Sequence, residues 1–344
     1  IVESDYRPLS REEASVWNAA HPPPAGDQVG EPHERALLEW MAADAERQVL
    51  SPLTGGGGDR GAESRTVVRG GFDVILGRRL SDVGEVSLLE PRSRPAAGHE
   101  LTLGRLRADD RGEELPILLL EPGGGRRRGV VVWIHEAGKS GLFGPDRHPR
   151  PPVRRLLDAG FAVLGVDLLF QGEFLSAAEA EPRRDPFRAR IVHQGGGFQA
   201  WQRSAVYTFG YNPPVFARRV HDVLTTLRYV REDEPRARVT LVGLGPVAGP
   251  LVVAARAQVD GPVRAAADTG GFRFEDVERF DDPMFVPGAV KYGGLLGLLA
   301  ASDGGELRMA GDADPASGCL LYTSPSPRDC GPDLVCRLLL EKGG

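Results

Sequence analysis

The stretch 236–257, RARVTLVGLGPVAGPLVVAARA, runs from an apolar segment through a glycine-rich turn into a second apolar segment. A strand, a tight turn and a helix in this order form the layout in which a G-x-S-x-G motif presents a nucleophilic serine. Gly245 stands where that serine would be, two residues after Gly243, and glycine cannot attack a carbonyl group. Pro246 lacks the backbone N–H that normally supplies half of the oxyanion hole. The stretch therefore predicts a degenerate nucleophile turn that lacks two catalytic elements.

The same glycines allow two other interpretations. Gly243-x-Gly245-x-x-Ala248 fits the G-x-G-x-x-G/A pattern of a dinucleotide-binding turn, and Asp268 follows near the place of a ribose-binding acid. That pattern belongs after the first strand of a nucleotide-binding sheet, whereas here it comes late in the chain. A plain turn is the third interpretation. Dinucleotide binding therefore stays an alternative, and we expect no cofactor.

The stretch 133–141, WIHEAGKSG, is a second candidate for chemistry. His135 and Gly138 enclose a His-Glu-Ala-Gly segment similar to the H-G-G-G loops whose backbone N–H groups stabilise an oxyanion, with departures at Glu136 and Ala137. A polar turn at the end of a strand is the other interpretation. A zinc motif would need a second histidine four residues after His135, and none is there. We therefore expect a remnant oxyanion loop and no metal.

Two further side chains could take part in ester chemistry. His193 and Ser204 lie in the glycine- and aromatic-rich stretch 191–214, which could cover the mouth of a pocket. An imidazole that activates a hydroxyl would give a serine nucleophile, so Ser204 is kept as an alternative. A loop with packed aromatic rings is the other interpretation. Asp167, at the end of another apolar run, is expected to be structural rather than catalytic.

The elements that must position these residues follow from the hydrophobic pattern. Short strand-like runs separated by turn residues come first, and continuous apolar runs then alternate with helix-like periodicity. This order predicts an α/β fold with antiparallel N-terminal strands and a mainly parallel sheet that carries helices on both faces. The expected strands lie at 85–91, 100–109, 114–122, 129–138, 161–170, 238–245, 263–270 and 306–311, with helices after 151, over 213–233 and after 248.

The N-terminal part of the sequence has a different pattern. Residues 1–31 are rich in proline and glycine and predict an extended segment, whereas 32–50 have helical periodicity. A second, short helix is expected within 63–79, interrupted at Gly70-Gly71. We predict a linker and helical appendage at 1–82, a main domain at 83–318 and a separate tail at 319–344.

One segment resembles a known family. The stretch 285–300, FVPGAVKYGGLLGLLA, is similar to the P-G-x-L-K-Y-G-D-x-P-x-L segment of acetylxylan-esterase-like members of the α/β-hydrolase superfamily, with departures at Val290 and Gly294. The resemblance implies an α/β-hydrolase fold related to carbohydrate esterases, with an ester or carbohydrate ligand. It also implies that AGDADP, at 310–315, follows a strand and carries the triad acid, which would be Asp314 or, as the alternative, Asp312.

In an intact relative, a serine at position 245 would attack the ester and a histidine after one further helix and strand would move the proton. This chain has neither group, so the resemblance implies a domain truncated before its last strand, and whether it is an enzyme stays open. The opening VESDYRPLSREEASVWNAAHPPP resembles the linker between two hydrolase domains of bacterial proteins. We therefore expect an upstream hydrolase domain of the same parent chain as a partner. The sequence itself gives no compartment, and a secreted or periplasmic protein is suggested by the family resemblance alone.

Composition narrows the remaining function classes. The net charge of −6 argues against nucleic-acid binding, and no run approaches the roughly 18 apolar residues that would span a membrane. All three cysteines lie in 319–344, a stretch that resembles a translated sequencing adapter. We therefore expect the tail to be non-native and the chain to be a metagenomic fragment of bacterial origin. Without that tail no cysteine is left for a disulfide or thiolate site.

Overall fold

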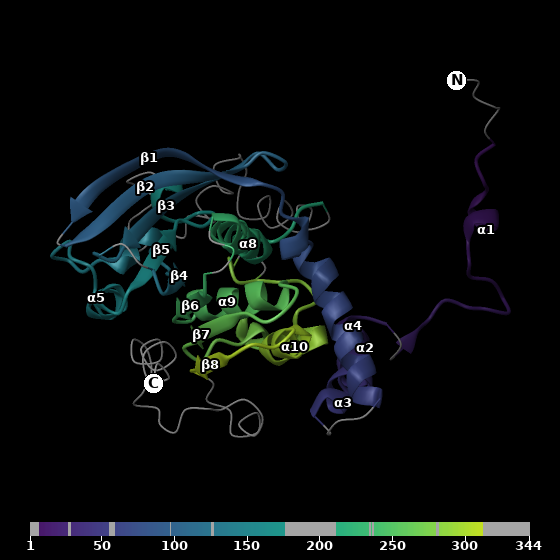
Figure 1. Cartoon of the computed structure of the whole chain (residues 1–344). Helices are drawn as coiled ribbons and strands as arrows, with labels where there is room; N and C mark the ends of the chain where they lie inside the picture. Colours follow the sequence, from purple (N-terminus) through teal and green to yellow (C-terminus); the bar gives the residue numbers. More distant parts are fainter. Residues whose placement is uncertain are drawn as a thin grey trace.

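The computed structural model describes residues 7–26, 29–54, 59–96, 98–124, 127–175, 211–233, 235, 237–279 and 282–311. An eight-stranded sheet forms its centre, with the strand order β1-β2-β3-β5-β4-β6-β7-β8 (Figure 1). The strands are β1 (Val86–Ala96), β2 (His99–Ala108), β3 (Glu113–Glu121), β4 (Gly129–Ile134), β5 (Phe161–Val166), β6 (Val239–Leu244), β7 (Arg264–Asp268) and β8 (Leu307–Ala310).

The pairing confirms the predicted fold class. β1, β2 and β3 form an antiparallel meander, and β3 pairs antiparallel with β5. The strands β5, β4, β6, β7 and β8 are parallel to one another. Every residue of β4 and β5 is buried, as expected for central strands that are covered on both faces.

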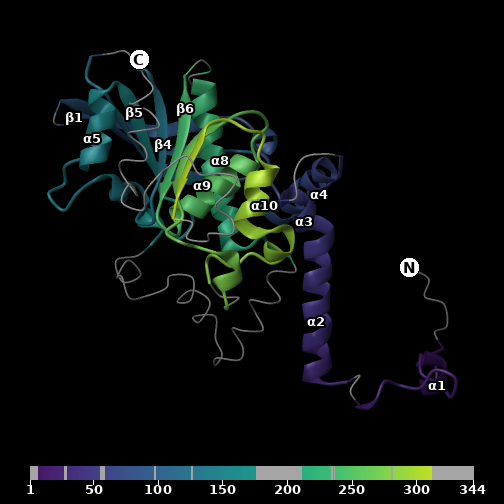
Figure 2. The same ribbon diagram turned by 90° about the horizontal axis from the view of Figure 1, so that it is seen from below.

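Helices cover both faces of this sheet (Figure 2). One face packs against α5 (Pro151–Asp158), whose Val153, Leu156 and Leu157 share a buried cluster with Val131 and Trp133 of β4. The other face packs against three helices, which are α8 (Val215–Asp233), α9 (Ala248–Ala257) and α10 (Gly294–Ala301). Short 3₁₀ turns complete the connections: η3 (Leu80–Asp82), η4 (Gly138–Leu142), η5 (Gly172–Phe174), η6 (Phe274–Asp276) and η7 (Val290–Tyr292).

The beginning of the N-terminal part extends away from the sheet (Figure 1). It contains α1 (Arg11–Ala14), α2 (Glu31–Ala45), the π-helical turn η2 (Glu46–Leu50), α3 (Ser51–Thr54) and α4 (Asp59–Leu76). The extended segment predicted for 1–31 is interrupted by α1, because Ser10 and Glu13 form a capping box that stabilises one helical turn. The helix α2 has no buried residue.

The predicted break in the second N-terminal helix is wrong. The helix α4 runs without interruption through Gly70-Gly71, and its Val68, Phe72 and Leu76 are buried in the same cluster as α8 and α9. A Cβ on Gly71 would come within 2.6 Å of the Tyr292 ring. The glycine therefore allows close packing of a ring and does not end the helix. The predicted boundary at residue 82 stays a prediction.

Within the part of the chain that the structure describes, no helix combines the length and the hydrophobicity that a membrane span requires.

Candidate functional site

The turn between β6 and α9 holds Gly245 at the slot of the missing serine. Its φ angle is +98°, in the left-handed region that glycine adopts at little cost. Its N–H donates to the Asp268 carbonyl oxygen of β7 at 2.8 Å, and its own carbonyl oxygen accepts from Gly249 N at 3.0 Å. Among the described residues, no atom lies within 4 Å of the place that a Cβ on Gly245 would take. The backbone is therefore fixed by two hydrogen bonds, and no described residue fills the place of a side chain.

The neighbouring glycines are needed for close packing. A Cβ on Gly249 would overlap the carbonyl oxygen of Asp268, and a Cβ on Gly243 would overlap that of Ala248. The first turn of α9 therefore lies against the ends of both β6 and β7. Exposed Pro246 comes between Gly245 and the helix and offers no N–H.

The loop after β4 carries the predicted oxyanion residues, but its N–H groups already have acceptors. Ala137 N donates to His135 Nδ1 at 3.0 Å, and Gly138 N donates to the His135 carbonyl oxygen at 3.0 Å. Lys139 N donates to Asp167 Oδ1 at 2.9 Å. Burial lowers the pKa of His135 and the nearby Arg150 guanidinium lowers it further, while Glu136 opposes the shift. The ring is therefore neutral at pH 7 and acts as an acceptor toward its own loop.

A buried ion cluster ties this loop to the loop after β5. The carboxylate of Asp167, which is 1% exposed, pairs with the ammonium of Lys139, which is 8% exposed. Glu173 contributes its backbone N–H to Asp167 Oδ2 at 3.0 Å and its own carboxylate to Lys139 Nζ at 2.6 Å. Gly138 and Gly172 have no side chains that would displace the carboxylate. Asp167 therefore has the structural position that was expected, and its partner Lys139 was missed.

Asp222 of α8 holds the same region from the other side. Leu169 N donates to its Oδ2 at 2.8 Å, which joins α8 to the loop after β5. Burial raises the pKa of Asp222 to about 7, and the neighbouring Glu113 carboxylate adds to this rise. The Leu169 N–H and the Arg219 guanidinium oppose it. No sequence pattern pointed to this group, since a single acid on an amphipathic helix is normally exposed.

A cavity of about 460 Å³ opens beside the Gly245 turn. It lies at the carboxyl ends of β4 and β6, next to the start of α5. Its lining residues are Trp133, His135, Gly141, Arg150, Pro151, Pro152, Arg155 and Leu244. Trp133 is 5% exposed, and its indole N–H is buried without an acceptor among the described residues. An unsatisfied buried donor of this kind costs about 1–3 kcal/mol.

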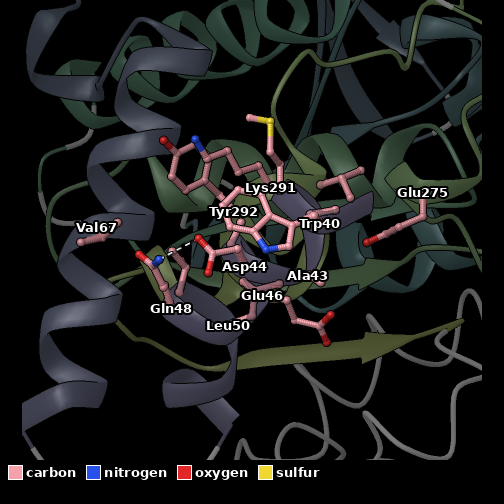
Figure 3. Close-up of a pocket in the computed structure, with 15 residues that line it drawn as sticks. Trp40, Ala43, Asp44, Glu46, Gln48, Leu50, Val67, Glu275, Lys291 and Tyr292 are labelled. Atoms are coloured by element: carbon pink, nitrogen blue, oxygen red, sulfur yellow. Dashed lines mark hydrogen bonds between the residues drawn. The ribbon is translucent and has the colours of Figure 1, made fainter. Parts of the chain in front are cut away.

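A larger groove of about 890 Å³ lies between α2, η2 and η7 (Figure 3). Trp40, which is 60% exposed, and Tyr292 lie along it, and Gln48 donates to Asp44 at 2.8 Å within it. Val290, Lys291 and Tyr292 of the family-like segment line this groove and not the cavity beside His135. The segment therefore packs against the N-terminal helices, and the ring centroids of Tyr292 and Phe72 of α4 lie 6.3 Å apart.

Four predicted site residues lie outside the described residues, namely His193, Ser204, Asp312 and Asp314. Within the described ranges, no group of three or more His, Cys, Asp or Glu side chains is placed to hold a metal ion. The structure brings together the Gly245 turn, the end of β7 and, through the cavity, the His135 loop.

No protein-family model and no curated protein sequence matches the chain. Among solved structures it is similar to a candidate acetyl xylan esterase from Bacteroides fragilis, at 11% identity over 72% of this chain and 67% of that chain, with a TM-score of 0.48. The acetyl xylan esterase from Paenibacillus sp. R4 is similar at 14% identity over 71% of this chain and 88% of that chain, with a TM-score of 0.40. The glucuronoyl esterase from Solibacter usitatus is similar at 12% identity over 72% of this chain and 75% of that chain, with a TM-score of 0.40.

These TM-scores lie below 0.5, so the fold assignment rests on the sheet itself. An antiparallel start, parallel β-α-β units and a tight glycine turn from β6 into α9 agree with the arrangement that the resemblance to α/β-hydrolases implied. The chain has an α/β-hydrolase-like fold.

Proposed function

We propose that this chain is a non-catalytic α/β-hydrolase domain, related to carbohydrate esterases, which keeps a binding role. The observation that carries the proposal is Gly245, which occupies the nucleophile slot with φ +98° and has no atom of a described residue within 4 Å of the place of its missing Cβ. This geometry supports the interpretation of the turn as a degenerate nucleophile turn. Losing the serine of a catalytic triad typically costs on the order of 10⁶ in kcat.

The hydrogen bonds of the two loops support this proposal. The N–H groups of Ala137, Gly138, Lys139 and Gly245 all donate to acceptors within the protein, and Pro246 has none to donate. Oxyanion stabilisation requires preorganised donors that point at the developing charge. These five positions therefore offer no donor for a tetrahedral intermediate in this conformation.

A direct assay tests the proposal. The purified chain is incubated with p-nitrophenyl acetate beside bovine albumin as a control protein and a serine esterase as a positive control. We expect turnover equal to the albumin control and no labelling by a fluorophosphonate probe, which requires an activated serine. Turnover well above albumin together with labelling at Ser204 would overturn the proposal in favour of the alternative nucleophile.

The dinucleotide alternative is tested separately. In a dinucleotide site the N–H groups of the glycine turn face a pyrophosphate. Here the Gly245 N–H donates to Asp268, and Pro246 removes the next donor. We therefore expect no saturable change in NADH fluorescence when the chain is added, and such a change would support dinucleotide binding.

The proposal includes a partner, which is a hydrolase domain with an intact G-x-S-x-G turn in a longer parent chain. It is supported by the linker-like opening of the sequence. Long-read sequencing of the source locus tests it together with the adapter-like stretch 319–344. An intact upstream domain and a different sequence in place of 319–344 would support both points. A serine codon at position 245 would instead return catalysis to this domain.

A further inference from the structure

The groove between α2, η2 and η7 exposes large apolar side chains that come from separate parts of the chain. Trp40 and Met41 of α2 are each more than half exposed, and Val67 of α4 and Val290 of η7 are nearly half exposed. Single exposed apolar residues are ordinary, whereas several that line one groove mark a site of interaction. The groove has a volume of about 890 Å³, which side chains of a partner can fill.

The apolar surface continues from this groove along α2. Leu37 and Leu38 lie four and three residues before Met41, so their side chains stand one turn away on the same side of the helix. Both are exposed, and α2 has no buried residue because it projects from the body of the molecule (Figure 2). Apolar residues at this spacing form an apolar stripe against which a second helix can pack. The surface therefore has the elongated shape that suits a helix.

The floor of the groove is fixed by the packing of η7 against its neighbours. Gly293 follows η7 with a φ angle of +83°, and a Cβ there would come within 2.7 Å of the Leu50 side chain of η2. The Tyr292 ring packs over Gly71, where a Cβ would come within 2.6 Å, and against the Phe72 ring. Since these walls are in place before a partner arrives, docking costs less conformational entropy.

The charge of the groove indicates the chemistry of the partner. Asp44, Glu46 and Glu275 line it with carboxylates, whereas Lys291 is the one cation among the described residues that line it. Asp44 pairs with Arg47 at 2.9 Å, but the exposed carboxylates of Glu46 and Glu275 have no ion pair with a described residue. Such carboxylates attract lysine and arginine and repel an acidic partner. Charge complementarity therefore selects a basic partner.

A second copy of this chain does not supply that charge. Within residues 31–50 the acidic side chains are Glu31, Glu34, Glu39, Asp44 and Glu46, and the arginines are Arg35 and Arg47. Both arginines already pair within their own helical segment, with Glu31 and Asp44. Two copies that pack through α2 would therefore bring an excess of negative charge together, which opposes docking. A surface of anionic lipids is opposed for the same reason.

We propose that this groove and the apolar stripe of α2 dock an amphipathic helix of a partner protein, with lysine or arginine beside its apolar face. The apolar face packs on Trp40 and the stripe, and the flanking cations meet Glu46 and Glu275. Recognition of a helix in a groove uses apolar anchors at helical spacing. The inference goes beyond the proposed function, because it uses no residue of the Gly245 turn or of its cavity. Ester turnover by the chain would therefore leave it unaffected.

Fluorescence anisotropy with a labelled synthetic peptide tests the proposal on the full chain. The peptide has about 18 residues, long enough to form a helix, with leucine at helical spacing and lysine at the other positions. One control peptide replaces every lysine by glutamate, and a second has the same residues in an order without an apolar face. We expect saturable binding of the first peptide and at least about tenfold weaker binding of both controls. Equal binding of either control, or no binding of the first peptide, would overturn the inference.

Variants of the chain place the binding in the groove. Trp40→Ala removes an aromatic side chain of the groove, whereas Trp17→Ala removes a tryptophan that is 50% exposed outside it. We expect Trp40→Ala to weaken peptide binding by about tenfold and Trp17→Ala to change it less than about twofold. Glu275→Gln should weaken binding by about threefold, and Glu12→Gln, which changes an exposed acid of α1, by less than about twofold. Equal effects within either pair would overturn the inference.

Two measurements distinguish the other occupants. Size-exclusion chromatography with light scattering gives the mass of the parent chain and of Trp40→Ala, and flotation with phosphatidylglycerol vesicles measures lipid binding. We expect a monomeric parent chain that does not float with the vesicles. A dimer that Trp40→Ala abolishes would overturn the inference in favour of a second copy. Vesicle binding that the same variant abolishes would overturn it in favour of a lipid surface.

Discussion

Replacement of Asp222 by asparagine should remove a pH dependence of stability. The carboxyl group lies buried between α8 and the loop after β5, where desolvation raises its pKa from 3.8 to about 7. In the unfolded chain the group ionises near its ordinary pKa. Between these two values the folded state keeps the proton that the unfolded state has lost, so the free energy of unfolding falls as the pH rises.

The size of the effect follows from the shift. A rise from 3.8 to about 7 is roughly three pKa units, and each unit corresponds to 1.36 kcal/mol. The full contribution is therefore about 4 kcal/mol, present below pH 3.8 and lost by the time the pH passes 7. Between pH 5.5 and pH 8.5 the parent chain should lose about 2 kcal/mol that the variant does not lose. Glu113, Arg78 and Arg219 face the same group and are unchanged in both proteins.

Urea unfolding at pH 5.5 and at pH 8.5 measures this difference. We expect the free energy of unfolding of the parent to fall by about 2 kcal/mol relative to that of Asp222→Asn between pH 5.5 and pH 8.5. The matched control is Asp158→Asn, because Asp158 is an exposed acid on α5. An equal pH dependence in the parent and in Asp222→Asn would refute the reasoning, because it would mean that the carboxyl group is hydrated or ionised in the folded state.

Three further predictions concern the loops around the cavity. Gly245→Ala should lower the free energy of unfolding by about 1–2 kcal/mol, because alanine is strained at this backbone angle. Gly249→Ala should lower it more, because its Cβ would overlap a backbone oxygen. Thermal unfolding ranks the two variants, and the reverse order would contradict this packing. Lys139→Met should lower the free energy of unfolding by about 3–5 kcal/mol, because it leaves the Asp167 carboxylate buried without its cation. Urea unfolding measures this loss, and a loss below about 1 kcal/mol would show that water reaches the carboxylate. Gly141→Ala should lower the free energy of unfolding by about 1–3 kcal/mol, because its Cβ would overlap the His135 ring. An unchanged urea unfolding midpoint would contradict this packing.

Much of the fold could be predicted from local pattern. The strands fall within about two residues of most predicted ranges, because apolar runs and periodicity report which faces of a segment are buried. The helix expected over 213–233 is α8. The Gly70-Gly71 break was wrong because a glycine pair reads as a helix breaker, whereas here it makes room for Tyr292. The predicted roles of the family-like segment and of Asp314 stay predictions.

The sequence by itself determined that the nucleophile slot holds Gly245 and that Pro246 has no N–H, because these are properties of residue type. It also determined the order of strands and helices, which depends on local periodicity. The tertiary structure decided which groups meet. The pairing of Lys139 with Asp167 and the shared cavity of Arg150 and Leu244 depend on β4 lying between β5 and β6. Strand order is set by the packing of the whole core, so no local pattern could show that these residues converge at one edge of the sheet.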